Sequence, residues 1–397
     1  MNLAALKSPQ YCLYLIGNVF GMNANWIMRL VIGWLAWDLT KSASFVGFVS
    51  FLNFSPALLG GPVFGVIVDK ADLRKAMLLV QFTITALSLV MLGVVAMDKT
   101  SPTFLAVYAL IIGTAFTAYQ PIRLSLGPRL VRPERVSSVV SLGALNFNIS
   151  RLTGPAIAGT LIANYGVTFT MATVCALYVP FLLFLARLHP RPRNVQAEAL
   201  PFWQSMRQGF KFVLSSRLIL IAMITTGIFS LAIRAATEVL PIIADGIFER
   251  GAAGLGMLAA AAGVGAIVAS IMQVMADPPV RGYIPRRALL ATLLGSVLTL
   301  ALGFNESWPV AVALIGGIGF TSTLVGINFQ SAVQMQLDDD MRGRVMSLWM
   351  TVAVGGTALG ALAVGVLIEY IGFTPALGGI GVVSIIIFAA LVSKVWR

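Results

Sequence analysis

The feature that most constrains this chain is a succession of apolar runs with little polar sequence between them. Each run holds the roughly 20 residues that an α-helix needs to cross a hydrocarbon core of ~30 Å. The longest polar interval, from about Leu188 to Arg217, is too short for a separate soluble domain. The runs predict twelve membrane spans, at 11–37, 45–67, 76–97, 104–127, 137–164, 167–187, 217–241, 254–275, 286–304, 309–335, 345–368 and 375–393.

The composition agrees with a polytopic membrane protein. Hydrophobic residues make up 58% of the chain and charged residues only 11%, whereas a soluble domain has about 25% charged residues. A net charge of +12 could indicate a nucleic-acid binder. The bases lie instead in short loops between apolar runs, as the positive-inside rule requires. We therefore expect a lipid bilayer as surroundings and no nucleic-acid partner.

The distribution of Lys and Arg predicts the orientation. Twenty bases fall on one side of the predicted spans, three (Lys41, Lys99 and Arg250) fall on the other, and four lie within spans. Because cytoplasmic loops carry the excess of bases, both termini are predicted to be cytoplasmic. The first run has no charged segment before it and no small-residue cleavage site, so we interpret it as a retained helix.

Three short matches suggest that the chain is built from two related halves. GVIVDK at Gly65 matches QVMADP at Gln273, RVSS at Arg135 matches RVMS at Arg344, and NYGVTFT at Asn164 matches YIGFTPA at Tyr370, with offsets of 206 to 209 residues. Similar offsets at equivalent places in six-span units indicate duplication. We predict an all-α integral membrane fold of two six-helix bundles, at 1–187 and 217–397, joined by a cytoplasmic loop at 188–216.

The loop at 188–216 contains a stretch with helical periodicity, from Phe202 to Leu214, in which Arg207 and Lys211 lie four residues apart. It predicts an amphipathic helix that either rests on the membrane surface and ties the halves together or is a solvated linker.

The sequence shows no motif of an enzyme or a metal site. The single His189 has no Cys or carboxylate cluster near it in the sequence. We therefore expect neither an enzyme nor a metal site, and Cys12 and Cys175 suggest no disulfide.

Arg151 lies inside a predicted span, three residues before a Gly-Pro pair. A charge at mid-membrane costs ~2.5–3.5 kcal/mol on insertion scales, so Arg151 is expected to face the bundle interior. Asn148, Arg151 and Pro155 share one helix face, and Gly154 and Gly159 allow close helix packing. One interpretation is a hinge beside an anion-attracting site, and the other is a packing motif with a buried ion pair.

Three further spans carry polar stripes on their predicted helices. Asn25 and Arg29 lie on the first span, Arg234 and Glu238 on the seventh, and Asn328 and Gln330 on the tenth. Arg234 and Glu238 form an i,i+4 pair of opposite sign, which suggests either a structural ion pair or a proton site. We include Arg123 of the fourth span among the candidates for the substrate path, although it could also reach the membrane interface.

Carboxylates within the predicted spans are scarce, and they decide the candidates for proton coupling. Proton coupling needs a group that alternates between two environments. Glu238 is the first candidate, followed by Asp38, which could instead cap the turn that follows it.

Two motifs carry a family resemblance. The loop GVIVDKADLRK resembles the signature between helices 2 and 3 of the major facilitator superfamily, and RLTGPAIAG resembles the helix-5 motif of its proton antiporters. The first match implies a cytoplasmic gating loop with Lys in place of the usual Arg, formed by Gly65, Asp69, Lys70, Arg74 and Lys75. The second match is partial, and it involves Arg151, Gly154, Pro155 and Gly159.

Longer stretches, such as WLAWDLTKSASFVGFV and LPIIADGIFERGAAGLGMLAAAAGVGA, resemble the branch of this superfamily that holds enterobactin-type siderophore exporters and macrolide efflux proteins. The resemblance implies a monomer in the bacterial inner membrane that exports a small amphiphilic molecule by alternating access and proton antiport, with the proton gradient in place of a cofactor. The basic spans suggest an anionic cargo. Uptake of an organic anion or nutrient, or a scaffold or sensor role without transport, remain alternatives.

Overall fold

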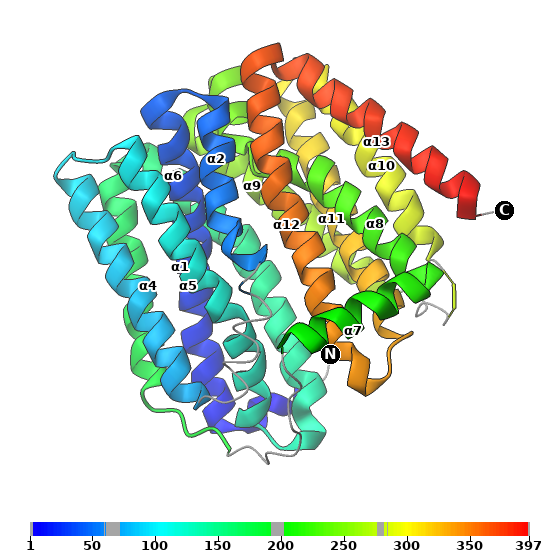
Figure 1. The fold of residues 1–397 in the computed structure, drawn as a ribbon. Helices are drawn as coiled ribbons and strands as arrows, with labels where there is room; N and C mark the ends of the chain where they lie inside the picture. Colours follow the sequence, from blue (N-terminus) through cyan, green and yellow to red (C-terminus); the bar gives the residue numbers. More distant parts are fainter. Residues whose placement is uncertain are drawn as a thin grey trace.

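The computed structural model describes residues 3–58, 60, 72–191, 202–275, 282–283 and 285–395. Throughout these residues the secondary structure is helical. The long helices, labelled as in Figure 1, are α1 Pro9–Thr40, α2 Ala43–Phe54, α4 Leu73–Ala96, α5 Pro102–Leu126, α6 Val136–Leu185, α7 Phe202–Ser215, α8 Arg217–Ala232, α9 Gly251–Val274, α10 Arg286–Gly303, α11 Trp308–Gln334, α12 Asp339–Ile371 and α13 Phe373–Val395.

Each of the twelve predicted spans contains helix, although the second span is described only as far as residue 60. Nine helical stretches of the described chain are long and apolar enough to cross a membrane, and the 32-residue α1 and the shorter apolar helix Ala43–Leu58 add two more. The twelfth span comes from α6, which has 50 residues and bends at Gly166, where φ is 79°. A straight helix of that length would measure about 75 Å, so the bend divides α6 into two spans.

Several helices begin where a small polar side chain satisfies the free N–H groups of the first turn. Ser42, Ser101 and Ser216 accept hydrogen bonds from the backbone N–H groups of Phe45, Phe104 and Ile219, and Asp72 does the same for α4. Ser101 is followed by Pro102, which occupies the first position of α5 without losing a useful donor. These signals fix where α2, α4, α5 and α8 start.

The helices form two bundles that lie side by side in Figure 1. In the N-terminal bundle α1 packs on α6, and α4 and α5 pack on each other; in the C-terminal bundle α9 and α10 pack on α11, and α8 packs on α12. The bundles meet through two helix pairs, α2 with α12 and α6 with α9. We call the end with the Thr40–Ala43 and Phe248–Gly251 turns the distal end, at the top of Figure 1, and the opposite one the terminal end.

Both inter-bundle pairs cross at glycines. A Cβ atom on Gly159 of α6 would lie 2.5 Å from the Cα atom of Gly256 of α9, and one on Gly365 of α12 would lie 3.0 Å from the Cα atom of Gly47 of α2. Side chains at these positions cannot fit between the backbones. The crossings lie toward the distal end, so the structure has its distal side closed.

The two crossings are the same contact repeated in the two halves. Gly256 follows Gly47 by 209 residues, and Gly365 follows Gly159 by 206 residues, which are the offsets of the sequence matches. The nearest carbonyl oxygens show the same offset. A Cβ atom on Gly159 would lie beside the carbonyl oxygen of Ala252, and one on Gly365 would lie beside that of Ala43, 209 residues earlier. Internal duplication thus explains why the closed interface has two equivalent contact points.

Substitution at one crossing tests this description. Gly159→Leu is expected to separate α6 from α9 and to shift the protein away from the distal-closed conformation. Overpacking of this kind costs roughly 1–3 kcal/mol, which changes a two-state ratio by about 5- to 150-fold. Spin labels on the distal residues Asn164 and Tyr370 would report the change as a longer inter-bundle distance.

The matched control is Gly143→Leu in the same helix, because a Cβ atom on Gly143 has no neighbour within 4 Å. This variant is expected to keep the wild-type distance between the labels. An equal change in both variants would show that the crossing does not hold the distal side closed.

Candidate functional site

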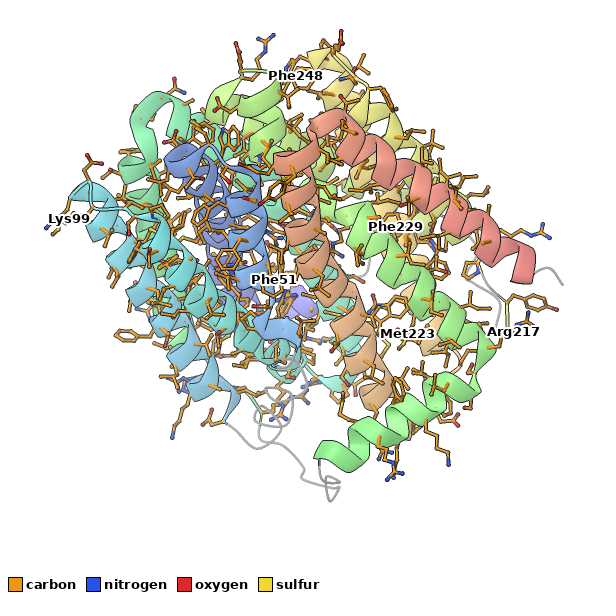
Figure 2. All side chains as sticks on the ribbon, turned by 45° about the horizontal axis from the view of Figure 1, so that its top comes forward. Phe51, Lys99, Arg217, Met223, Phe229 and Phe248 are labelled. Atoms are coloured by element: carbon orange, nitrogen blue, oxygen red, sulfur yellow. The ribbon has the colours of Figure 1, made fainter. Side chains whose placement is uncertain are left out.

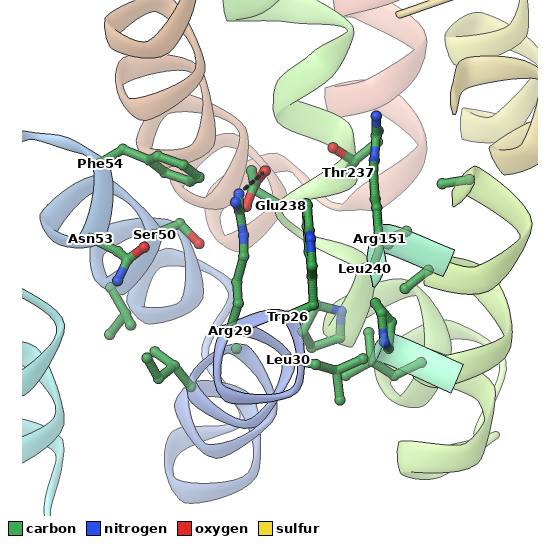
Figure 3. Close-up of a pocket in the computed structure, with 18 of the residues that line it drawn as sticks. Trp26, Arg29, Leu30, Ser50, Asn53, Phe54, Arg151, Thr237, Glu238 and Leu240 are labelled. Carbon is green, nitrogen blue, oxygen red and sulfur yellow. Dashed lines mark hydrogen bonds and ion pairs between the residues drawn. The ribbon is translucent and has the colours of Figure 1, made fainter. Parts of the chain in front are cut away.

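A cavity of about 160 Å³ lies between the bundles, at the level where α1 faces the segment after α8. Its wall combines aromatic and aliphatic side chains with an unusual number of charged groups (Figure 3). The polar residues of the wall are Arg29, Ser50, Asn53, Arg151, Arg234, Thr237 and Glu238. Both bundles contribute, so relative motion of the bundles must change the shape of this cavity.

Arg29 of α1 forms an ion pair with Glu238 across the bundle interface. Its Nη2 atom lies 2.8 Å from Oε1 of Glu238, and the two side chains are 33% and 13% exposed. The guanidinium carbon lies 4.3 Å from the ring centroid of Phe54 and 5.4 Å from that of Trp26. The carboxylate draws the Arg29 guanidinium toward the C-terminal bundle, and the rings of Trp26 and Phe54 contact it from the N-terminal bundle (Figure 3).

The i,i+4 pair expected between Arg234 and Glu238 is not the ion pair of the structure. The predicted span 217–241 does not continue as an α-helix, because α8 ends at Ala232 and Arg234–Thr237 form a 3₁₀ turn. Pro241 follows, and its ring disfavours an α-helical carbonyl at residue 237. The tighter turn removes the i,i+4 geometry, and Glu238 pairs with Arg29 instead.

Arg151 and Arg234 are the charges of the cavity without such a partner. Within the described part of the chain, neither guanidinium group has a hydrogen bond or an ion pair. Arg234 is exposed, although the adjacent Ala235 and Ala236 are fully buried, so its exposed surface faces the interior passage. Three guanidinium groups and one carboxylate leave the described cavity wall with a net charge of about +2.

The RLTGPAIAG motif, which lies in α6, positions Arg151. Gly154 lies against Trp26 of α1, since a Cβ atom there would be 2.5 Å from the Cβ atom of Trp26. Pro155 lines the cavity one turn after Arg151, and Gly159 forms the crossing with α9. The motif brings α6 close to both α1 and α9, so Arg151 projects into the space between the bundles (Figure 3).

Several predicted path residues lie elsewhere. Asn25 accepts a hydrogen bond from the Tyr178 hydroxyl at 2.6 Å, inside the N-terminal bundle. The Asn328 side chain is buried in the C-terminal bundle and donates to Oε1 of Gln273 at 2.9 Å. In this conformation each of these two amides has a partner inside its own bundle rather than a place in the cavity wall. The cavity wall also does not include Asn148, Gln330 or Arg123, whose Nε atom donates to Gln120.

Only two of the five predicted residues of the gating loop lie within the part of the chain that the structure describes. Gly65, Asp69 and Lys70 lie outside the described residues. Arg74 and Lys75 begin α4, where their backbone N–H groups donate to Oδ1 of Asp72. The Arg74 guanidinium also donates to the carbonyl oxygen of Ala186, which ties the terminal ends of α4 and α6 together.

A second polar cluster, the distal latch, closes the interface at its distal end. Asp245 accepts hydrogen bonds from Nε1 of Trp37 at 2.7 Å and from Nζ of Lys41 at 3.1 Å. Glu369 accepts from the N–H groups of Ala43 and Ser44 at 2.6 and 3.3 Å, at the N-terminus of α2. Both acids belong to the C-terminal bundle and all the donors to the N-terminal bundle.

The latch is charged over a wide pH range. Partial burial acts to raise the pKa of Asp245, but the hydrogen bonds from Trp37 and Lys41 outweigh it and lower that pKa below its usual value. Burial acts to lower the pKa of Lys41, and its contacts with Asp38 and Asp245 raise it overall. The stabilising contribution of Asp245 is therefore lost only as the pH falls through its lowered pKa, in the acid range.

Asp38, the second candidate for proton coupling, lies at this distal end. Its side chain is 49% exposed and forms an ion pair of 3.1 Å with Lys41. It does not line the cavity that holds Glu238. The structure thus separates the two carboxylates that the sequence analysis grouped together.

The sequence analysis missed two groups of residues. The cavity wall also includes Trp26, Ser50, Asn53 and Phe54, which were not singled out because none of them carries a charge. Asp245 and Trp37 of the latch are separated by 208 residues. This separation is close to the offset between the two halves, so the internal repeat could have indicated that the two residues lie at equivalent positions. Arg29 and Glu238 are separated by 209 residues, so they occupy equivalent positions of the two halves.

Comparisons with known proteins agree with this architecture. The model of the transmembrane secretion effector family matches residues 1–396. The chain is 26% identical over 370 residues to the enterobactin exporter EntS of Shigella boydii serotype 4 (strain Sb227), covering 92% of this chain and 87% of that protein. The same coverage and identity hold for enterobactin exporter EntS of Escherichia coli O1:K1 / APEC.

Solved structures show the same fold at low sequence identity. The nucleoside transporter NupG has a TM-score of 0.75 at 12% identity, with 97% of this chain and 98% of that chain covered. The human organic anion transporter MFSD10 (TETRAN) has a TM-score of 0.70 at 15% identity, with 96% and 99% covered. Family and relatives are transporters rather than enzymes, and this chain is a multi-pass membrane protein that belongs to the transmembrane secretion effector family of the major facilitator superfamily.

Proposed function

We propose that the protein exports a small amphiphilic anion, of siderophore or drug type, across the bacterial inner membrane. The observation that carries this proposal is the cavity in which Arg29, Arg151 and Arg234 face a single carboxylate. A passage with this charge attracts anions and repels cations. The enterobactin exporters among the relatives favour the outward direction and the siderophore type of cargo.

The orientation follows from the same proposal. The terminal end, which carries most of the bases, faces the cytoplasm together with both chain termini. Cargo enters from that side while the glycine crossings and the distal latch hold the distal side closed. Rocking of the two bundles about the cavity then breaks these distal contacts and releases cargo outside. One chain contains the complete cavity, so the transporting unit is a monomer.

The cavity divides the binding tasks between its arginines. Arg151 and Arg234 have no protein partner in the described chain, and they bind the anionic group of the cargo. Arg29 is already paired with Glu238, whose remaining carboxylate lone pairs accept hydrogen bonds from hydroxyl groups of the cargo. Trp26, Phe54 and Phe147 supply apolar contact for rings.

Glu238 provides the coupling to protons in this proposal. A proton on its carboxylate makes Glu238 a weaker acceptor for the cargo hydroxyl groups, so protons and cargo compete for the site. Competition of this kind is what antiport requires, because the carrier then returns with a proton in place of cargo. Export of cargo is driven by protons that move inward.

The geometry also defines the alternative of anion uptake with protons. If a cargo anion took the place of Glu238 on Arg29, the released carboxylate would favour protonation, and cargo and proton would bind together. The two schemes predict opposite effects of pH on cargo affinity.

One prediction of this proposal concerns Arg151, one of the two arginines without a partner. Arg151→Gln is expected to lower cargo affinity by about 10- to 150-fold, since a hydrogen bond to a charged group contributes roughly 1.5–3 kcal/mol. Transport into inverted membrane vesicles would show the loss. Arg123→Gln is the matched control, because Arg123 is an intramembrane arginine outside the cavity wall. Near-normal transport by the Arg151→Gln variant would remove this residue from the site.

The second prediction concerns the sign of the proton effect. Cargo binding to purified protein is expected to weaken as the pH is lowered, and the Glu238→Gln variant is expected to lose this dependence. Calorimetric titration at several pH values measures both. The Asp38→Asn variant serves as the control and keeps the wild-type dependence. Binding that strengthens at low pH would overturn antiport and favour uptake of an anion with protons.

A further inference from the structure

A second and larger hollow lies on the outer side of the C-terminal bundle, away from the central cavity. It encloses about 830 Å³ between α8, α12 and α13, and α7 closes it at the terminal end. This volume is within the roughly 300–1,000 Å³ of small-molecule sites. In Figure 1, α13 runs away from α12 after their shared turn, and α8 lies between them. We call this hollow the lateral groove.

The lateral groove has the shape of an extended ligand. Its wall follows α12 from Leu348 to Ile371, a rise of about 35 Å at 1.5 Å per residue. That length is similar to the ~30 Å thickness of a hydrocarbon core. A compact solute would fill only part of it, whereas an acyl chain could lie along it.

The chemistry of the wall fits hydrocarbon. Ser384 is the one residue of the wall with a polar side chain among those described, and it is 3% exposed. Large apolar side chains such as Ile224, Leu231 and Val383 are 42–54% exposed at the groove. Gly379 deepens the groove, because a Cβ atom there would have no neighbour within 4 Å.

Basic residues collect at the terminal end of the lateral groove. Phe210 and Leu214 of α7 line it, and Arg207 and Lys211 of the same helix are exposed on an adjoining face. The sequence from 202 to 217 contains no acidic residue. Figure 2 shows Arg217 at the corner between α7 and α8, and Met223 further along α8. The apolar groove thus ends at a basic helix.

We propose that the lateral groove binds a phospholipid with an anionic headgroup. One acyl chain lies along α8 and α12, and the phosphate group lies beside Arg207 and Lys211 of α7. The amphipathic helix therefore rests at the membrane surface and takes part in lipid binding. This site is separate from the central cavity, so it does not depend on the direction of transport or on the cargo.

Native mass spectrometry of the purified full chain with added phosphatidylglycerol tests the proposal. The wild-type protein is expected to retain phosphatidylglycerol. The double variant Arg207→Gln with Lys211→Gln is expected to bind it about 25-fold more weakly, at about fivefold per base. The headgroup of phosphatidylcholine has no net charge, so binding of this lipid is expected to be the same in the double variant as in the wild type. Gly379→Phe is expected to weaken binding of both lipids, because the ring fills the groove.

Matched controls lie in the other bundle and at the other end of the molecule. A Cβ atom on Gly93 of α4 also has no neighbour within 4 Å, so Gly93→Phe adds an equal ring outside the groove, and Lys99→Gln removes a distal base. Both are expected to retain lipid as the wild type does. Losses in the controls equal to those in the groove variants would overturn the proposal.

A second measurement needs no substitution within the packed interior. A spin label on Leu367, an exposed residue of the groove, is expected to be broadened by nitroxide-labelled phosphatidylglycerol more than a label on Val90 of α4. Equal broadening at the two positions would contradict the site. A doubled mass in light scattering with no retained lipid would show that a second copy of the chain covers this face.

Discussion

The structure depends on placing guanidinium groups inside a membrane protein without exposing them to lipid. A single such charge costs ~2.5–3.5 kcal/mol at the centre of a span on insertion scales. The protein places Arg29, Arg151 and Arg234 together at the interface of the bundles, where one carboxylate and two aromatic rings compensate Arg29. Repulsion among the remaining charges makes the interface receptive to an anion.

Duplication explains why opposite charges meet at this place. Arg29 and Glu238 are separated by 209 residues, and Gly47 and Gly256 by the same number. In a protein with two related halves, equivalent residues near the symmetry axis face each other. An ancestral pair of identical charges would repel, so divergence to Arg on one side and Glu on the other turns repulsion into attraction. The glycines remain identical because both crossings need close backbones.

Local sequence patterns predicted the helices of this protein better than the contacts between them. Apolar runs and short polar caps depend on local sequence, and they predicted the twelve spans and the two bundles. Arg29, Arg151, Arg234 and Glu238 were predicted to face the interior, because a charge in an apolar run needs an interior position, and they line one cavity. Asn25 and Asn328 lie outside its wall, because helix periodicity does not tell which neighbouring helix a polar face meets. The lateral groove was not predicted, because it arises from the divergence of α12 and α13.

In the proposed alternating-access cycle, Glu369 has a consequence for the rate at which the bundles part. It satisfies the N–H groups at the start of α2 from the opposite bundle, and Ser42 accepts only from Phe45 among the backbone N–H groups of this turn. When the bundles part, Ala43 and Ser44 must exchange the carboxylate for water, and closing must remove that water again. Hydration of a helix terminus is therefore one component of the barrier, so solutes that lower water activity should alter the speed of opening as well as its equilibrium.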